Sequence, residues 1–247
     1  PDPGKIENLQ DLIKVVKSES ADVGIAFDGD GDRLGVVANN GEIVYPDQLM
    51  MIFSKEVLKN NQGKEIIFDV KCTNLLGKII NEAGGIPVMS PTGHFHIKNT
   101  LKKTNAPLAG EMSGHIFFND HWYGFDDAHY SAFRLIEIIK NFKSPLDDLI
   151  KDLPKAYSTP EMNIDVEENK KFQLVDDFIS TANFGTANKI TIDGLRVNFE
   201  DGWGLLRASN TTPKLVLRFE ANSPKRLNEI KNMFLTQLKK IDETINI

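Results

Sequence analysis

Apolar residues near the start of the chain recur three and four positions apart, which is the spacing of one helix face. The short apolar run from Val23 to Phe27 follows them and predicts a buried strand. Two further strands, Leu34 to Ala38 and Glu42 to Tyr45, flank Asn39-Asn40-Gly41, whose residues tolerate positive φ and therefore predict a hairpin turn. The helical positions are Ile6, Leu9, Leu12, Ile13 and Val16.

From Asp47 onward, helical and strand-like segments alternate. Such alternation is typical of βαβ units, which place helices around a mostly parallel sheet. The expected helices are 47–59, a segment from Thr73 to Gly84-Gly85, 95–103, 127–141 and a short one opened by Ser144-Pro145. The expected strands are 65–70, 86–89 and one that ends at Ala109.

Leu153-Pro154-Lys155 interrupts this alternation and predicts a domain boundary near residue 155. Strand candidates joined by short turns dominate the rest of the chain, which predicts an α+β domain with an antiparallel sheet. The strand candidates are 162–166, 189–192, 195–199, 204–207 and 215–220, and helices are expected near 168–181 and after Ser223.

The composition is that of a folded globular protein, with 40% hydrophobic and 26% charged residues. A formal charge of −6 disfavours a nucleic-acid partner, because phosphate contacts need a clustered basic surface. No apolar run approaches the length of a membrane helix, and Pro1-Asp2-Pro3 does not open a secretory signal. The single cysteine, Cys72, is interpreted as a packed small residue in a reducing compartment, so we expect a cytoplasmic protein with no membrane partner.

Three aspartates, Asp28, Asp30 and Asp32, alternate with glycines directly after the first expected strand. Three like charges need a counter-ion, and a hard divalent cation such as Mg²⁺ satisfies them through oxygen ligands. The alternative is a solvated turn, which the preceding strand and the glycines disfavour. An EF-hand does not fit, because Arg33 and Asn39 occupy the positions of its glycine and its last glutamate. A phosphatase of the haloacid dehalogenase type stays a distant alternative, since it would want a small hydroxyl or apolar residue in place of Asp32.

A second polar loop, residues 207–213, lies between two expected strands near the end of the chain. It gathers a guanidinium, three hydroxyls and an amide, which suits a phosphate, because arginine offers a bidentate fork and hydroxyls and turn N–H groups donate to the remaining oxygens. The alternative is an ordinary polar turn in which Arg207 pairs with a surface acid. The loop reads Arg207-Ala208-Ser209-Asn210-Thr211-Thr212-Pro213.

A third loop, Gly110-Glu111-Met112-Ser113-Gly114-His115, combines a carboxylate, a hydroxyl and an imidazole between glycines. This mixture suits sugar hydroxyls, although a plain glycine-bounded loop is an equal reading of the motif alone. Lys71 and the segment Thr92-Gly93-His94 follow two expected parallel strands, so they should join the same crevice at the carboxyl ends of those strands. His94 and His96, with His115 or His121, could instead hold zinc, but no second paired spacing supports that interpretation.

Together the motifs at 28–33, 110–115 and 207–213 resemble, in order and spacing, the metal, sugar and phosphate loops of the α-D-phosphohexomutase family. The form Gly-Glu-Met-Ser-Gly-His is similar to the phosphomannomutase/phosphoglucomutase branch, whereas a glutamine in place of Met112 would point to phosphoglucosamine mutase. The resemblance covers essentially the whole chain, and Pro1-Asp2-Pro3 with Glu7-Asn8-Leu9 also resembles the segment that leads to the family's metal loop.

The resemblance implies four domains, of which this chain holds the end of the second (1–42), an α/β third (43–154) and an α+β fourth (155–247). The first domain, which supplies a phosphoserine nucleophile in the family, is expected to be missing. The implied activity of the intact enzyme is interconversion of hexose 6-phosphate and hexose 1-phosphate through a hexose 1,6-bisphosphate, with Mg²⁺ as cofactor. A non-catalytic sugar-phosphate-binding fragment, or a phosphoglucosamine mutase, is the alternative.

The resemblance also implies roles for the site residues. Asp28, Asp30 and Asp32 would hold Mg²⁺ with Arg33 at its edge, and Glu111 and Ser113 would bind O3 and O4 of the sugar. His115 is the candidate general acid/base, and Lys71 is a further contact at the reacting end. Arg207, Ser209, Asn210 and Thr211 would anchor the phosphate that does not react, and Thr92, Gly93 and His94 would line the site.

Overall fold

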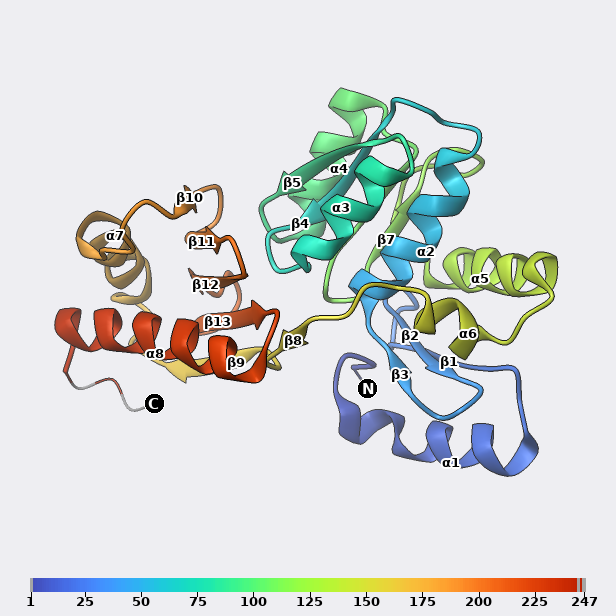
Figure 1. Ribbon diagram of the computed structural model, residues 1–247, viewed down its shortest axis with the longest axis horizontal. Coiled ribbons are helices and arrows are strands. Elements are labelled where there is room, and N and C mark those ends of the chain that lie inside the picture. Colours follow the sequence, from blue (N-terminus) through green and yellow to red (C-terminus); the bar gives the residue numbers. More distant parts are fainter. Residues whose placement is uncertain (1, 244, 246–247) are drawn as a thin grey trace. The chain divides into compact units, whose positions relative to one another are not determined.

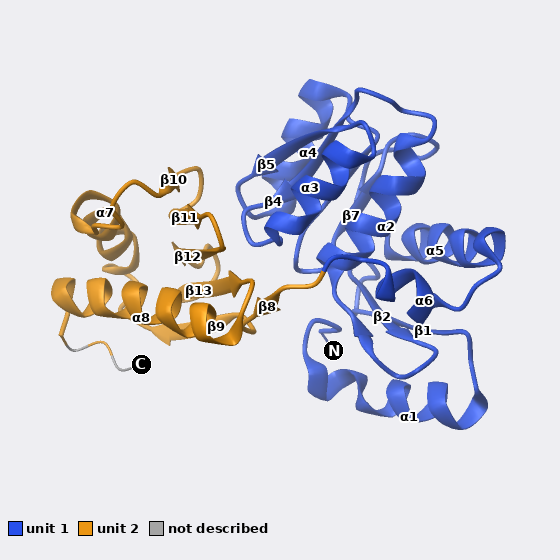
Figure 2. Ribbon diagram, in the orientation of Figure 1, with its two compact units in different colours: residues 1–154 blue, residues 155–247 orange. Residues whose placement is uncertain are grey.

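In the computed structural model, which describes residues 2–243 and 245, the chain folds into two compact units. Unit 1 spans residues 1–154 and unit 2 spans residues 155–247, and Figure 2 colours them separately. Each unit has its own hydrophobic core. None of the helices in the described residues is both long and apolar enough to cross a membrane.

Unit 1 begins with a three-stranded antiparallel sheet in the order β1-β2-β3. Its middle strand is buried along its whole length, whereas β1 is only half-buried, so the prediction of a buried first strand was wrong. Strand β1 is at the edge of the sheet, where it pairs with β2, and helix α1 packs against it. The elements are η1 (Ile6–Leu9), α1 (Gln10–Glu19), β1 (Val23–Phe27), β2 (Leu34–Ala38) and β3 (Ile43–Val44).

The rest of unit 1 is a three-layer α/β arrangement around a four-stranded sheet, β5-β4-β6-β7. The pairs β4/β5 and β4/β6 are parallel, which confirms the mostly parallel sheet, while β7 is antiparallel to β6 and was not predicted. Helix α4 packs on one face of the sheet, and α2 and α3 lie on the other. The strands are β4 (Glu65–Asp69), β5 (Ile86–Ser90), β6 (Leu108–Gly110) and β7 (Ile116–Phe118). The helices are α2 (Pro46–Leu58), α3 (Asn74–Glu82), α4 (His94–Thr104), α5 (Ala128–Phe142) and α6 (Leu146–Lys151).

One core joins the two sheets of unit 1. It includes Leu34 and Val36 of β2, Leu49 and Phe53 of α2 and Leu135 of α5. The free energy gained by burying apolar side chains is roughly proportional to the area removed from water. The shared core therefore stabilises the position of β2 against the α/β layers. The loop that enters β2 is thereby held beside the loops of the parallel sheet.

Unit 2 is an antiparallel sheet with two helices, as predicted. The order is β10-β11-β12-β13-β8, with β9 also paired to β13. Apolar side chains on one face of the sheet pack against both helices, while alternate residues such as Trp203 and Arg196 point to the other face. The elements are β8 (Tyr157–Ser158), β9 (Met162–Asp165), α7 (Lys171–Thr181), β10 (Asn188–Ile190), β11 (Leu195–Phe199), β12 (Gly202–Ala208), β13 (Lys214–Ala221) and α8 (Pro224–Ile241). Strand β8 was not predicted, and β10 ends at Ile190 rather than at the expected Ile192.

Candidate active site

The aspartate loop, residues 28–33, is the connection between the antiparallel strands β1 and β2, with Phe27 and Leu34 paired at its base. Asp28 organises the loop, because its Oδ1 accepts the backbone N–H groups of Asp32 and Arg33 at 3.1 Å. Its Oδ2 accepts Arg33 Nε at 2.5 Å. Burial opposes ionisation of Asp28, but these bonds from Arg33 outweigh it and lower the pKa of the carboxyl to about 2.

The three aspartates of this loop converge as a metal site requires. One carboxylate oxygen from each of Asp28, Asp30 and Asp32 lies within 4.8 Å of the other two. Burial raises the pKa of Asp32, and the charges of Asp28 and Asp30 add to that effect against the opposing influence of His115. Oδ1 of Asp32 is buried and makes no hydrogen bond to any described residue. Crowded carboxylates with an unused oxygen fit a hard divalent cation such as Mg²⁺.

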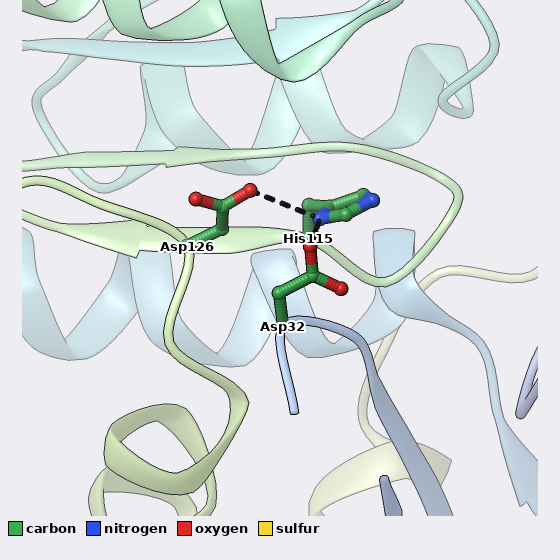
Figure 3. Close-up of side chains that lie close together, drawn as sticks. All are labelled: Asp32, His115 and Asp126. Atoms are coloured by element: carbon green, nitrogen blue, oxygen red, sulfur yellow. Dashed lines mark ion pairs between the residues drawn. The ribbon is translucent and has the colours of Figure 1, made fainter. Parts of the chain in front are cut away.

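The aspartate loop is joined directly to the loop at residues 110–115. Leu34 donates its backbone N–H to the carbonyl of Gly114 at 3.1 Å, and Arg33 and His115 form an isolated antiparallel bridge. Gly114 has φ +100°, and a Cβ there would lie 3.0 Å from the carbonyl oxygen of Leu34, so only glycine allows this approach. The His115 side chain points back toward the aspartates, with Nδ1 3.6 Å from Asp32 Oδ2 (Figure 3).

Glu111 connects the 110–115 loop to the 91–94 loop. The residue is only 2% exposed. Its Oε1 accepts a hydrogen bond from the Gly93 backbone N–H at 2.5 Å, and its Oε2 accepts one from the Ser113 hydroxyl at 3.4 Å. Burial raises the pKa of Glu111, and the neighbouring Asp69 raises it further. The structure therefore brings Glu111, Ser113 and Gly93 together, as the sequence predicted for one crevice.

Asp69, at the carboxyl end of β4, is a site residue that the sequence analysis missed. Although the residue is fully buried, its carboxylate accepts the Met112 backbone N–H and the Thr92 hydroxyl, both at 3.1 Å. Lys71 Nζ lies 4.0 Å from Asp69 Oδ2. Asp69 thus holds the 91–94 and 110–115 loops at the edge where Lys71 was expected, because parallel β4 and β5 end together.

Asp126 and Lys98 are two further residues that were missed. The Asp126 side chain is 6% exposed, and its Oδ1 lies 2.6 Å from Lys98 Nζ. Its Oδ2 lies 3.2 Å from His115 Nδ1 and 3.4 Å from His94 Nδ1, although the His94 side chain is 59% exposed. The sequence predicts a helix that starts at about Asp127, and Asp127 does cap α5. The sequence carries no signal that Asp126 points inward.

The pKa values of Asp126 and His115 are shifted in opposite directions. Burial opposes the charged form of each, but the His115 and Lys98 contacts lower the pKa of Asp126 well below its usual range. The carboxylates of Asp126 and Asp32 in turn raise the pKa of His115. An imidazole held by carboxylates that favour its protonated form suits a side chain that exchanges protons with a substrate.

In unit 2, Arg207 lies at the end of β12 and is 4% exposed. Its Nε donates to Asp193 Oδ2 at 2.9 Å, so the predicted alternative of a pairing with an acid is observed, but the arginine of the pair is buried and Asp193 is half-buried. Among the described residues, Nη2 of Arg207 is buried without a hydrogen-bond partner. A buried donor of this kind fits an anion.

The hydroxyl of Ser209 shapes the rest of the 207–213 loop. It accepts the backbone N–H groups of Thr211 and Thr212 at 3.4 and 3.2 Å and the Thr212 hydroxyl at 2.8 Å. Asn210 and Thr211 are exposed. The nearly buried Lys171, which the sequence analysis missed, donates from Nζ to the carbonyl of Thr212 at 3.2 Å. The loop is thus preformed, with its two central residues facing solvent.

The four histidines considered for zinc are not gathered together. His96 and His121 are exposed, and neither belongs to a group of three potential ligands within the described ranges. His94 and His115 lie near each other, with ring centroids 6.0 Å apart. The zinc interpretation by these four histidines therefore has no support in the fold.

Comparison with known proteins gives consistent matches along the chain. Three family models match: phosphoglucomutase/phosphomannomutase alpha/beta/alpha domain II at residues 1–41, alpha/beta/alpha domain III at 45–157, and the C-terminal domain at 161–237. The chain is 54% identical over its whole length to a phosphomannomutase/phosphoglucomutase of Pseudomonas putida. It covers 53% of that protein, and so spans about half the length of the curated relatives it matches.

Solved structures give the same result. The crystal structure of a phosphoglucomutase/phosphomannomutase family protein from Burkholderia thailandensis superposes with a TM-score of 0.93 at 50% identity, and the match covers the whole of this chain and 52% of that one. An N-acetylphosphoglucosamine mutase from Aspergillus fumigatus, in complex with GlcNAc-6P and magnesium, has a TM-score of 0.66 at 11% identity and shares the fold. That match covers 88% of this chain and 48% of the other.

Proposed function

The chain belongs to the phosphoglucomutase/phosphomannomutase family, and from that premise we propose that it is the metal-binding and sugar-phosphate-binding part of a phosphohexomutase. The intact enzyme interconverts hexose 6-phosphate and hexose 1-phosphate, of mannose, glucose or both, through a hexose 1,6-bisphosphate. An enzyme phosphoserine, which we expect outside this chain, donates and reclaims the phosphoryl group.

The observation that carries the proposal is the direct junction between the aspartate loop and the 110–115 loop. The Leu34–Gly114 hydrogen bond and the contact of His115 with Asp32 put carboxylates for a cation beside groups that suit sugar hydroxyls. A phosphoryl transfer to a sugar needs this neighbourhood, because positioning and charge neutralisation supply most of its catalysis.

Asp28, Asp30 and Asp32 would hold Mg²⁺, which neutralises charge on a transferring phosphoryl group when bound. Arg33, held between Asp28 and Asp2, adds positive charge beside the same group. His115 takes a proton from the attacking sugar hydroxyl and returns one to the leaving oxygen.

The sugar is held at the carboxyl edge of the parallel sheet. Glu111 accepts hydrogen bonds from O3 and O4 through lone pairs that Gly93 and Ser113 leave free, and the Ser113 oxygen can accept from one of these hydroxyls. Lys71 contacts the reacting end, while Thr92 and His94 line the site. Mannose and glucose differ at O2, so a grip on O3 and O4 accepts either sugar.

The 207–213 loop anchors the phosphate that does not react. Arg207 contributes its guanidinium, and Ser209, Asn210 and Thr211 contribute hydroxyl and amide donors. Asp193 keeps the guanidinium in place between turnovers.

Calorimetric titration with mannose 1-phosphate in the presence of Mg²⁺ tests the anchor. Arg207→Ala should weaken binding by about 1.5 to 3 kcal/mol, the usual worth of a charged hydrogen bond. Arg226→Ala is the matched control, because Arg226 pairs with Asp201 in the same unit at 2.9 Å but lies outside the loop. Equal affinities of the wild type and Arg207→Ala would overturn the phosphate assignment.

An activity assay with glucose 1,6-bisphosphate present tests the expected location of the nucleophile. This chain by itself should bind hexose phosphate without converting mannose 1-phosphate to mannose 6-phosphate. Turnover by the chain alone would show that the phosphoryl group is carried by a residue of this chain.

A further inference from the structure

Asp32, His115 and Asp126 form a second group of potential metal ligands, distinct in chemistry from the three aspartates of residues 28–33. One imidazole nitrogen and one oxygen from each carboxylate lie within 4.8 Å of one another. Figure 3 shows that both carboxylates approach the same nitrogen, Nδ1 of His115. The first group offers only oxygens, whereas the second offers nitrogen as well.

The two distances from the imidazole nitrogen to the carboxylates match those between ligands of a tetrahedral ion. His115 Nδ1 lies 3.2 Å from Asp126 Oδ2 and 3.6 Å from Asp32 Oδ2. Ligands at about 2.0 to 2.2 Å from a tetrahedral zinc ion are roughly 3.3 to 3.6 Å apart. Asp32 has the most exposed side chain of the three, at 28%, and can move to close the remaining carboxylate edge.

The two carboxylates of the group face the same imidazole nitrogen. Asp126 Oδ2 and His115 Nδ1 are buried and form an ion pair with each other at 3.2 Å, and Asp32 Oδ2 lies 3.6 Å from the same nitrogen. The Asp126 side chain is 6% exposed, and Lys98 occupies its Oδ1, which leaves Oδ2 facing the imidazole. A metal ion needs the unprotonated nitrogen of the imidazole, so a cation at the centre of the group would take the place of the proton that now joins His115 to the carboxylates.

We propose that Asp32, His115 and Asp126 bind a borderline divalent metal ion, of which Zn²⁺ is the type, with water or His94 as a fourth ligand. Imidazole suits zinc and cobalt, whereas Mg²⁺ prefers oxygen ligands alone. His94 is a suitable fourth ligand because its Nδ1 is already 3.4 Å from Asp126 Oδ2 and its exposed ring can turn. The site shares Asp32 with the aspartate loop but needs neither Asp28 nor Asp30.

Such an ion would withdraw His115 from proton transfer. Zinc would then inhibit the intact enzyme by removing His115 from proton transfer as well as by competing with Mg²⁺ for Asp32, a consequence that rests on the proposed function. The binding of the metal itself does not rest on it, so a failed activity assay and a failed metal titration remain separate results.

Titration of the purified chain with Co²⁺ tests the site, because four-coordinate Co²⁺ absorbs visible light more strongly than six-coordinate Co²⁺. We expect an intense band in the wild type that Zn²⁺ abolishes. His115→Gln and Asp126→Asn should each weaken the binding that gives this band by about tenfold or more, since each removes one ligand. Asp30→Asn is the control, because Asp30 belongs only to the aspartate loop, and it should retain the band.

Proton NMR of the Co²⁺ form gives a second readout that does not depend on any variant folding. A ring N–H of a histidine bound to Co²⁺ should appear as a strongly shifted, exchangeable resonance in the wild type. Absence of that resonance would overturn the proposal. Loss of the visible band in Asp30→Asn with its retention in both His115→Gln and Asp126→Asn would do the same, since it would place Co²⁺ in the aspartate loop alone.

Discussion

The aspartate loop and the 207–213 loop are both connections between antiparallel strands, yet different forces hold them. In the first, hydrogen bonds and charges around Asp28 set the backbone, and the remaining carboxylates repel one another. In the second, the buried Arg207 is already paired with Asp193, and a serine hydroxyl closes the turn. The aspartate loop therefore carries negative charge that a cation would neutralise, whereas the 207–213 loop is preformed.

This difference follows from the charge of the group that each loop is proposed to bind. A cation site must concentrate negative charge, so a bound cation should add to the stability of its loop. An anion site can use neutral N–H and O–H donors, which do not repel one another.

Each unit contains one tryptophan, Trp122 or Trp203, so ¹⁹F NMR of the chain labelled with 5-fluorotryptophan reports unfolding of the two units separately.

The largest effect is expected at Gly194, which packs behind the 207–213 loop. Gly194 has φ +75°, and a Cβ there would lie 2.3 Å from the Leu206 carbonyl oxygen and 2.7 Å from Arg207 Cα, both backbone atoms. Gly194→Ala should lower the free energy of unfolding of unit 2 by about 3 kcal/mol, combining left-handed strain with overpacking.

Gly185→Ala is the matched control for this substitution. Gly185 also has positive φ, at +62°, but a Cβ there meets nothing within 4 Å. Gly185→Ala should lower the free energy of unfolding of unit 2 by the backbone strain alone, about 1 to 2 kcal/mol, when unfolding is followed by Trp203. Equal losses in the two variants would show that backbone packing does not position the 207–213 loop.

A smaller effect is expected when acid weakens the aspartate loop. The pKa of Asp28 is about 2 in the folded chain and about 3.9 when unfolded, so its stabilisation is present above the higher value and is lost as pH falls toward the lower one. Between about pH 5 and pH 3, without divalent ions, unit 1 should lose about 1 kcal/mol through this group. Asp28→Asn should lack that part of the loss in denaturant titrations followed by Trp122, and an identical pH dependence in the variant would contradict the assignment.

The smallest effect is expected at Ser209. Its hydroxyl accepts three hydrogen bonds within the 207–213 loop, but the loop is largely exposed, so water replaces most of them. Ser209→Ala should lower the stability of unit 2 by about 0.5 to 1 kcal/mol in the Trp203 signal. Ser180→Ala is a control at an exposed hydroxyl outside the loop, which donates to the Asp177 carbonyl at 3.0 Å. A loss above that for Gly194→Ala would reverse the order of backbone and hydroxyl contributions.

The sequence determined the elements whose causes are local. The helices, most strands and the turn at Gly41 follow from apolar spacing and from residues that tolerate positive φ, and they are found as predicted. The short strands β7 and β8 have too few residues for a repeating pattern and were missed. The equally short β3 was found because the turn at Gly41 marks its start. The three loops were recognised because their polar residues are contiguous.

Tertiary structure alone decided which isolated residues join those loops. Asp126 and Asp127 are adjacent and chemically identical, yet one points at His115 and the other caps α5. Asp69 and Lys98 likewise enter the site from β4 and α4. Their roles depend on which loops the fold brings within hydrogen-bond distance. The spacing of residues far apart in the chain does not predict those contacts.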